Sequence, residues 1–276
     1  RTKSLLRMLP RLSSSVTDIV KAGAAVGAAT ALMGSLSHAS EDHVPAPAYP
    51  WDHTGMMSSF DAASIRRGHQ VYTEICASCH SLNRIAFRNL VGVCYTEDEV
   101  KEMAADVDVE DGPNDEGEMF DRPGKLSDKL PSPYKNDEQA RSMNNGALPP
   151  DLSLIIKSRH GREDYLFALL TGYTDPPAGV EVAEGQYYNR YFAGGKLAME
   201  KQLNDGAVEF PDGTPATESQ MAKDVAVFLA WASEPEHDDR KRMGMKWFSA
   251  LCLMAGVTGW AKRWRWSPLK ARRITY

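Results

Sequence analysis

Five consecutive residues constrain this chain more than any other part of its sequence. Cys76, Ala77, Ser78, Cys79 and His80 form the pattern C-x-x-C-H. Two thiols at this spacing reach the two vinyl groups of one porphyrin and form thioethers, and the next residue offers its imidazole to the iron. The pattern therefore predicts one covalently attached haem c, held at Cys76 and Cys79, with His80 as an axial ligand.

Two other sites use a bare C-x-x-C pattern. A redox dithiol is usually set in a thioredoxin-like strand and helix, whereas the sequence upstream of Cys76 predicts a helix. A zinc site needs a second pair of ligands, which Cys94 and Cys252 do not form. We interpret Cys94 as a free thiol in the interior. A thiol–disulfide oxidoreductase and a haem sensor with an open iron site remain as alternative functions.

The predicted helix before the motif begins near Asp61 or Ser64. Ile65, His69 and Tyr72 recur in it at helical spacing with the two cysteines, so we expect one stripe to face the haem. Further helices are expected at 152–159, with Asp151 as its cap, at 164–170 and at 217–233. The segment 172–213 should be dominated by loops.

The charge of the chain is unevenly distributed. Residues 40–239 contain 17 Lys and Arg against 36 Asp and Glu, whereas the two flanks contain 15 basic residues and one acid. Within 97–121, twelve of 25 residues are acidic. An acidic domain is not a nucleic-acid binder, and it suits a cationic partner. The segment 97–121 is either a docking patch or an ordinary solvated surface.

Both flanks indicate a membrane. Residues 1–39 are typical of a mitochondrial targeting and sorting segment, which is either removed or retained as a membrane helix. Residues 40–239 form the expected haem domain. In 240–276, the apolar run 247–261 lies between basic clusters, which predicts a transmembrane anchor with a basic matrix tail. The expected fold is mainly α: a c-type cytochrome domain with long irregular loops and a C-terminal transmembrane helix.

The second axial ligand is less constrained by the residues alone. A thioether favours reduced iron, so methionine is expected in a high-potential electron carrier. Met221 lies in a helical apolar pattern typical of core packing, and the acidic stretch that contains Met103 and Met119 is unsuited to an apolar haem face. Met199 follows the aromatic and glycine-rich segment 187–195, which is suited to wrap a porphyrin edge, and it is the favoured candidate.

Several longer blocks resemble the mitochondrial cytochrome c1 family. They are the segments 66–80, 90–95, 124–128, 145–153, 170–173 and 234–237. The resemblance covers about residues 48–276. It implies that Met199 is the second axial ligand, since the family places its methionine in the motif that is here 191–199. It also implies that Pro149 and Pro150 pack near the haem, and that Arg159 and Tyr165 lie near its edge and propionates.

The resemblance further implies a place in a complex. Members of this family are the haem subunit of respiratory complex III, ubiquinol–cytochrome c reductase. The chain is thus expected to take electrons from the Rieske iron–sulfur subunit and pass them to soluble cytochrome c, beside cytochrome b in a dimeric complex. The expected location is the mitochondrial inner membrane, with the haem domain in the intermembrane space and the C-terminus in the matrix. No catalytic acid or base is expected, because the chain only carries electrons.

Overall fold

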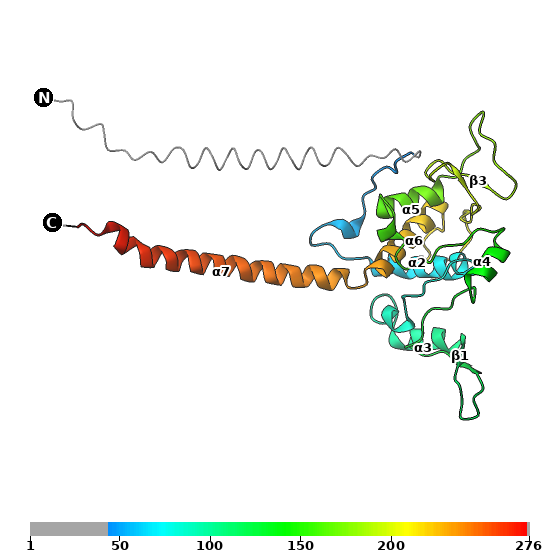
Figure 1. Cartoon of the computed structure of the whole chain (residues 1–276), viewed down its shortest axis with the longest axis horizontal. Coiled ribbons are helices and arrows are strands. Elements are labelled where there is room, and N and C mark those ends of the chain that lie inside the picture. The colour runs from blue at the N-terminus through cyan, green and yellow to red at the C-terminus, as the bar shows by residue number, and fades with distance from the viewer. Residues whose placement is uncertain (1–43, 275–276) are drawn as a thin grey trace. The chain divides into compact units, whose positions relative to one another are not determined.

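The computed structural model describes residues 44–274, so the predictions for 1–39 lie outside the described residues. Within that range the fold is mainly helical, as expected, with short 3-10 turns and two small sheets (Figure 1). The helices are α2 (Ala62–Glu74), α3 (Glu97–Ala105), α4 (Asp137–Met143), α5 (Arg162–Thr171), α6 (Glu218–Ser233) and α7 (His237–Ala271). The 3-10 turns are η1 (Asp52–Thr54), η2 (Cys76–Ser78), η3 (Phe87–Leu90) and η4 (Ile156–Ser158).

Helix α2 leads into the cysteine motif, as predicted. Asp61 caps it, because its carboxylate accepts the backbone N–H groups of Ala63 at 3.1 Å and Ser64 at 3.3 Å. The helix ends at Glu74, and the 3-10 turn η2 follows after Ile75. The motif is therefore a tight turn placed directly at the end of a capped helix.

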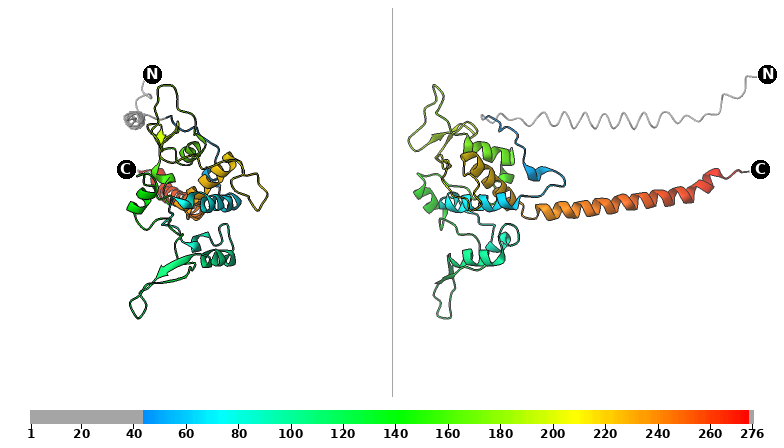
Figure 2. Two further views of the ribbon diagram at one scale, coloured as in Figure 1. Left: turned by 90° about the vertical axis from the view of Figure 1, so that its right-hand side faces the viewer. Right: turned by 180° about the vertical axis from the view of Figure 1, so that it is seen from behind.

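Helix α6 forms the centre of the core. Thr217 caps it by accepting the backbone N–H of Gln220 at 3.2 Å. Nearly every residue from Met221 to Ser233 is buried, because α2 and α5 both pack against the helix (Figures 1 and 2). The predicted helix at 217–233 is confirmed, but the helix is covered around its circumference rather than on one face.

The apolar stripe of α2 packs against α6. Ile65, His69 and Tyr72 are buried, and the rings of His69 and Tyr72 lie 5.4 Å and 5.8 Å from the ring of Phe228 on α6. The expectation that this stripe faces the haem is wrong for its helical part. Cys76 begins η2 and Cys79 follows as its C-cap, so both lie beyond the end of the helix and do not continue the stripe.

A buried ion pair joins α2 to α6. The Arg67 guanidinium donates to both carboxylate oxygens of Asp224, at 2.7 Å and 3.3 Å, and the Asp224 side chain is fully buried. Gln220 donates to the same carboxylate at 2.8 Å. A buried charge is tolerated only when it is paired and hydrogen-bonded, so this arrangement fixes how the two helices meet.

The segment 152–159 differs from its prediction. It contains turns and the 3-10 turn η4, not an α-helix. Asp151 still accepts the backbone N–H of Ser153 at 2.9 Å, but its carboxylate is shared with a second segment of the chain. The next element is α5, which starts at Arg162, two residues before the expected position.

The acidic segment folds into α3 and a hairpin. Thr96 and Glu99 form a reciprocal capping box at the start of α3. Strands β1 (Asp108–Asp111) and β2 (Phe120–Pro123) pair antiparallel, and residues 112–119 connect them. In the loop-rich stretch 172–213, strands β3 (Tyr187–Tyr188) and β4 (Lys196–Leu197) form the second small sheet.

Helix α7 contains the apolar run 247–261. Its start is tied to the domain, because the Lys241 ammonium donates to the carbonyls of His53, Gly55 and Ser58 at 2.6–3.1 Å. Farther along, large apolar side chains such as Trp247 and Leu253 are exposed. Among residues 44–274, no helix has both the length and the apolar character of a membrane span. The transmembrane segment is therefore not confirmed.

Candidate haem site

The C-x-x-C-H motif forms one compact turn. The backbone N–H groups of Cys79 and His80 both donate to the carbonyl of Cys76, at 3.1 Å and 2.9 Å. Both thiols are free and half-buried. This turn places the two thiols and the imidazole within five residues directly after α2, and attachment of a single porphyrin requires two thiols and an imidazole at this spacing.

The imidazole of His80 is held in one tautomer. Its Nδ1 lies 2.8 Å from the carbonyl oxygen of Pro150. Since a carbonyl only accepts, Nδ1 carries the proton and Nε2 carries the lone pair. Burial lowers the pKa of His80, although the Pro150 carbonyl and the Asp151 charge act in the opposite direction. The ring is therefore neutral near pH 7, with Nε2 unprotonated, which is the form of imidazole that can bind a metal.

A second contact holds the backbone of the same residue. The hydroxyl of Tyr72, on the last turns of α2, donates to the carbonyl of His80 at 3.0 Å. Tyr72 is 3% exposed and packs against Phe228, so its ring is fixed by the core. The sequence placed Tyr72 in a haem-facing stripe, whereas it acts on the motif by positioning His80.

The chemistry of the thiols separates two of the candidate functions. Burial, together with the nearby Cys79, raises the pKa of Cys76 to about 12. A disulfide oxidoreductase depends on a cysteine whose pKa is lowered, because the thiolate is the nucleophile. The site is thus poorly suited to dithiol exchange. Its two thiols and neutral imidazole fit a c-type haem.

Met199 lies just beyond β4, at the end of the glycine-rich segment. It is half-buried, and its carbonyl accepts the Tyr173 hydroxyl at 3.0 Å. The buried side chain of Asn189 donates to the Leu169 carbonyl at 2.7 Å, which ties the loop to α5. At Gly195 the φ angle is +71° and a Cβ would lie 2.7 Å from the Tyr188 ring, so the close turn there requires glycine.

The remaining candidates lie on separate elements. Pro150 contacts His80 directly, and Pro149 precedes it as a half-buried residue. Arg159 is exposed at the end of η4, where its guanidinium donates to the carbonyl and hydroxyl of Ser158 at 3.2 Å and 3.1 Å. Tyr165 is a half-buried residue of α5. The structure thus joins Pro150 to His80 through this hydrogen bond, and within residues 44–274 no hydrogen bond joins His80 to Met199 or Arg159.

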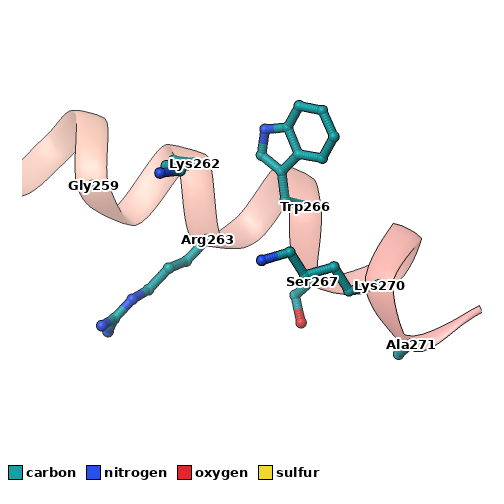
Figure 3. Close-up of a pocket in the computed structure, with 7 residues that line it drawn as sticks. All are labelled: Gly259, Lys262, Arg263, Trp266, Ser267, Lys270 and Ala271. Carbon is teal, nitrogen blue, oxygen red and sulfur yellow. The ribbon is translucent and has the colours of Figure 1, made fainter. Parts of the chain in front are cut away.

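A hollow on α7 lies apart from these residues. It is lined by residues that include Lys262, Arg263 and Trp266 on the basic end of the helix (Figure 3). It contains no candidate haem ligand. Within residues 44–274, no three His, Cys, Asp or Glu side chains cluster closely enough to hold a metal ion.

Comparisons with known proteins place this chain in a family. The Cytochrome C1 family model matches residues 51–269. The chain is 59% identical over 247 residues to "Cytochrome c1-2, heme protein, mitochondrial" of Solanum tuberosum, covering 88% of this chain and 95% of the relative.

Two fungal relatives are similarly close. "Cytochrome b-c1 complex catalytic subunit, mitochondrial" of Candida albicans is 57% identical over 239 residues, which is 86% of this chain and 83% of the relative. "Cytochrome c1, heme protein, mitochondrial" of Saccharomyces cerevisiae is 53% identical over 249 residues, which is 90% of this chain and 81% of the relative. With relatives at this identity over most of its length and a family model that matches 51–269, the chain belongs to the cytochrome c1 family.

Proposed function

We propose that this chain holds one covalent haem c and transfers single electrons. The observation that carries the proposal is the orientation of His80, whose Nδ1 is engaged by the Pro150 carbonyl so that Nε2 is available to iron. Cys76 and Cys79, on the same turn, would form the two thioethers. Relatives that are 59% and 53% identical are named heme proteins.

The side chains of this chain have distinct roles in the proposal. His80 and Met199 would be the axial ligands, and Pro149, Pro150, Arg159 and Tyr165 would lie around the macrocycle. When bound, the haem supplies a one-electron iron couple whose potential a thioether ligand raises. Helix α2, which contacts both the turn η2 and helix α6, would hold the motif in place, and a guanidinium at Arg159 is suited to pair with a propionate.

We propose that the chain works in the ubiquinol–cytochrome c reductase complex. It would take electrons from the Rieske iron–sulfur subunit and pass them to soluble cytochrome c, beside cytochrome b in a dimer. The Candida albicans relative, named a catalytic subunit of the cytochrome b-c1 complex, supports this assignment. The complex would carry the reductase activity, and this subunit would be its electron carrier.

The acidic surface supports a cationic electron acceptor. On α3, Asp98 and Glu102 are exposed, whereas Glu99 is bound to Arg66 at 2.7 Å and caps the helix. Exposed carboxylates raise the rate of encounter with a basic protein without binding it tightly. We therefore assign steering of cytochrome c to Asp98 and Glu102, and a structural role to Glu99.

We also propose that α7 anchors the haem domain in the mitochondrial inner membrane. The relatives from Solanum tuberosum and Saccharomyces cerevisiae are named as mitochondrial proteins. Trp247, Phe248 and Leu253 are each at least 63% exposed on α7, and exposed apolar groups of this size need a lipid or protein cover. The basic residues after 261 favour a matrix location for the C-terminus, which leaves the haem domain in the intermembrane space.

Substitution of Met199 tests the ligand assignment. Met199→Ala should keep the haem covalently bound, lower its potential by on the order of 0.1 V or more, and open the iron to carbon monoxide. The matched control is Met143→Ala, because that side chain is 71% exposed on α4. If Met199→Ala keeps the wild-type potential and stays closed to carbon monoxide, another residue is the sixth ligand.

A further inference from the structure

Two segments far apart in the sequence run side by side at the haem motif. Besides the contact between His80 and Pro150, the backbone N–H of Leu152 donates to the Ser81 carbonyl at 2.9 Å. The backbone N–H of Arg84 donates to the hydroxyl of Ser153 at 3.1 Å, and Ser153 is fully buried. The position of the Pro150 carbonyl therefore depends on how these segments are joined.

The carboxylate of Asp151 is the centre of that junction. One oxygen accepts the backbone N–H of Asn83 at 2.8 Å and the hydroxyl of Ser81 at 3.0 Å. The other oxygen accepts the backbone N–H of Ser153 at 2.9 Å. Both oxygens are thus used, and each holds a different segment. Hydrogen bonds to a charged acceptor are stronger than neutral ones, so a single side chain fixes the spacing between the segments.

Resting on the proposed function, we infer that Asp151 is a positioning residue for the axial ligand His80. Its carboxylate anchors the peptide that follows Pro150 to the peptides that follow His80, and this holds the Pro150 carbonyl at hydrogen-bonding distance from Nδ1. Asp151 thereby sets the strength of the Nδ1–H bond and, through it, the electron donation of His80 to iron.

The direction of the effect follows from the hydrogen bond. A carbonyl that accepts from Nδ1 makes the imidazole a stronger donor, which stabilises ferric iron and lowers the potential. Loosening the junction lengthens this bond, and the potential rises. The size should match the loss of about one hydrogen bond, so the one-electron reduction constant should rise about three- to tenfold, where tenfold is about 59 mV.

Removing a charge near the haem would also raise the potential, so the experiment separates the two causes. Asp151→Asn removes the charge and replaces one of the two carboxylate oxygens that accept hydrogen bonds. Asp151→Glu keeps the charge but displaces the carboxylate. Asp115→Asn, at an exposed acid between β1 and β2, is the control for loss of a charge elsewhere on the domain, and Asp151→Glu is the control for loss of charge at the motif. The full chain is purified with its haem, and the midpoint potential and the electron paramagnetic resonance spectrum of the ferric state are measured.

We expect both Asp151 variants to change the resonance spectrum, which reports the ligand field and orientation of His80, and Asp115→Asn to leave it unchanged. The potential should rise in Asp151→Asn and also in Asp151→Glu. If only Asp151→Asn shifts the potential and neither variant changes the spectrum, the effect is charge alone and the inference is overturned.

Measurement of the haem content distinguishes a failure of the proposed function from a failure of the role of Asp151. A wild-type chain without covalent haem would refute the function, whereas a haem-loaded chain with unchanged variants would refute only the role of Asp151. If both Asp151 variants fail to fold, Ser81→Ala removes one donor to the carboxylate without changing charge. It should shift the spectrum in the same direction, and an unchanged spectrum and potential in that variant would overturn the inference.

Discussion

Gly68 lies at a close approach between α2 and α6. A Cβ at this position would lie 2.1 Å from the backbone oxygen of Asp224 and 2.6 Å from Cβ of Phe228. The first contact is with backbone, so no rotation of a side chain can relieve it. Gly68→Ala therefore forces the two helices apart by more than about 1 Å if ordinary van der Waals contact is to be restored.

Two opposing effects set the magnitude for Gly68→Ala. Replacing glycine by alanine inside a helix contributes about 1 kcal/mol of stability. Overpacking costs about 1–3 kcal/mol when side chains can adjust, and more when backbone must move. Because separating the helices also strains the Arg67–Asp224 pair, the steric term should dominate. We expect a net loss of about 2 kcal/mol, or roughly 4–8 °C in Tm for a domain of this size.

The assay is thermal unfolding of the purified full chain, followed by calorimetry and by the haem absorbance. Gly244→Ala is the matched control, because that residue is helical and a Cβ there meets no atom within 4 Å. The control should unfold at or slightly above the wild-type temperature. If Gly68→Ala is as stable as the control, the close approach of α2 and α6 is not a constraint on the fold.

Three further predictions concern charge and topology. Changing Asp98 and Glu102 to amides should lower the rate of cytochrome c reduction at low salt and flatten its dependence on ionic strength, because exposed charges act within a Debye length of ~10 Å at 0.1 M; a stopped-flow rate with an unchanged salt slope would contradict steering. Burial acts to raise the pKa of Glu163, but the His53 and Arg162 contacts lower it overall. The ionised Glu163 carboxylate therefore stabilises the fold at pH values above the ordinary pKa of glutamate, and this stabilisation is lost as the pH falls through the lowered pKa. Glu163→Gln should therefore lower the free energy of unfolding at pH 7, measured by urea unfolding, by about 1–3 kcal/mol. As the pH is lowered, the free energy of unfolding should fall less in the variant than in the wild type. Identical pH profiles of the two proteins would refute this. In mitoplasts, added protease should digest the haem domain and spare a tag placed after Tyr276, whereas digestion of the tag across a sealed membrane would reverse the proposed topology.

Local sequence patterns predicted helices α2 and α6. Asp61 and Thr217 cap α2 and α6 with their own side chains, and the apolar spacing between caps and ends is unambiguous. The segment 152–159 was predicted wrongly because Asp151 looks like a helix cap in sequence. Its carboxylate also binds Ser81 and Asn83, residues about seventy positions away, and this competing use favours turns over an α-helix.

The candidate site also has residues that local spacing predicts and a contact that only the folded chain shows. Cys76, Cys79 and His80 follow from spacing within five residues. The partner of Nδ1 does not, because Pro150 reaches His80 only after the chain has folded back. Periodicity showed that α2 has an apolar stripe, but it cannot show whether haem or protein covers it. Here α6 supplies that cover, through the ring of Phe228.

An alkaline pyridine haemochrome spectrum tests whether haem is covalently attached at the C-x-x-C-H turn. The purified chain is first extracted with acidified acetone, which removes haem that is not covalently bound. We predict that haem remains with the protein and gives the spectrum of a haem with two thioether bonds. Cys76→Ala and Cys79→Ala should each give the spectrum of a haem with one thioether. Complete loss of haem from the wild-type chain on extraction would contradict the account.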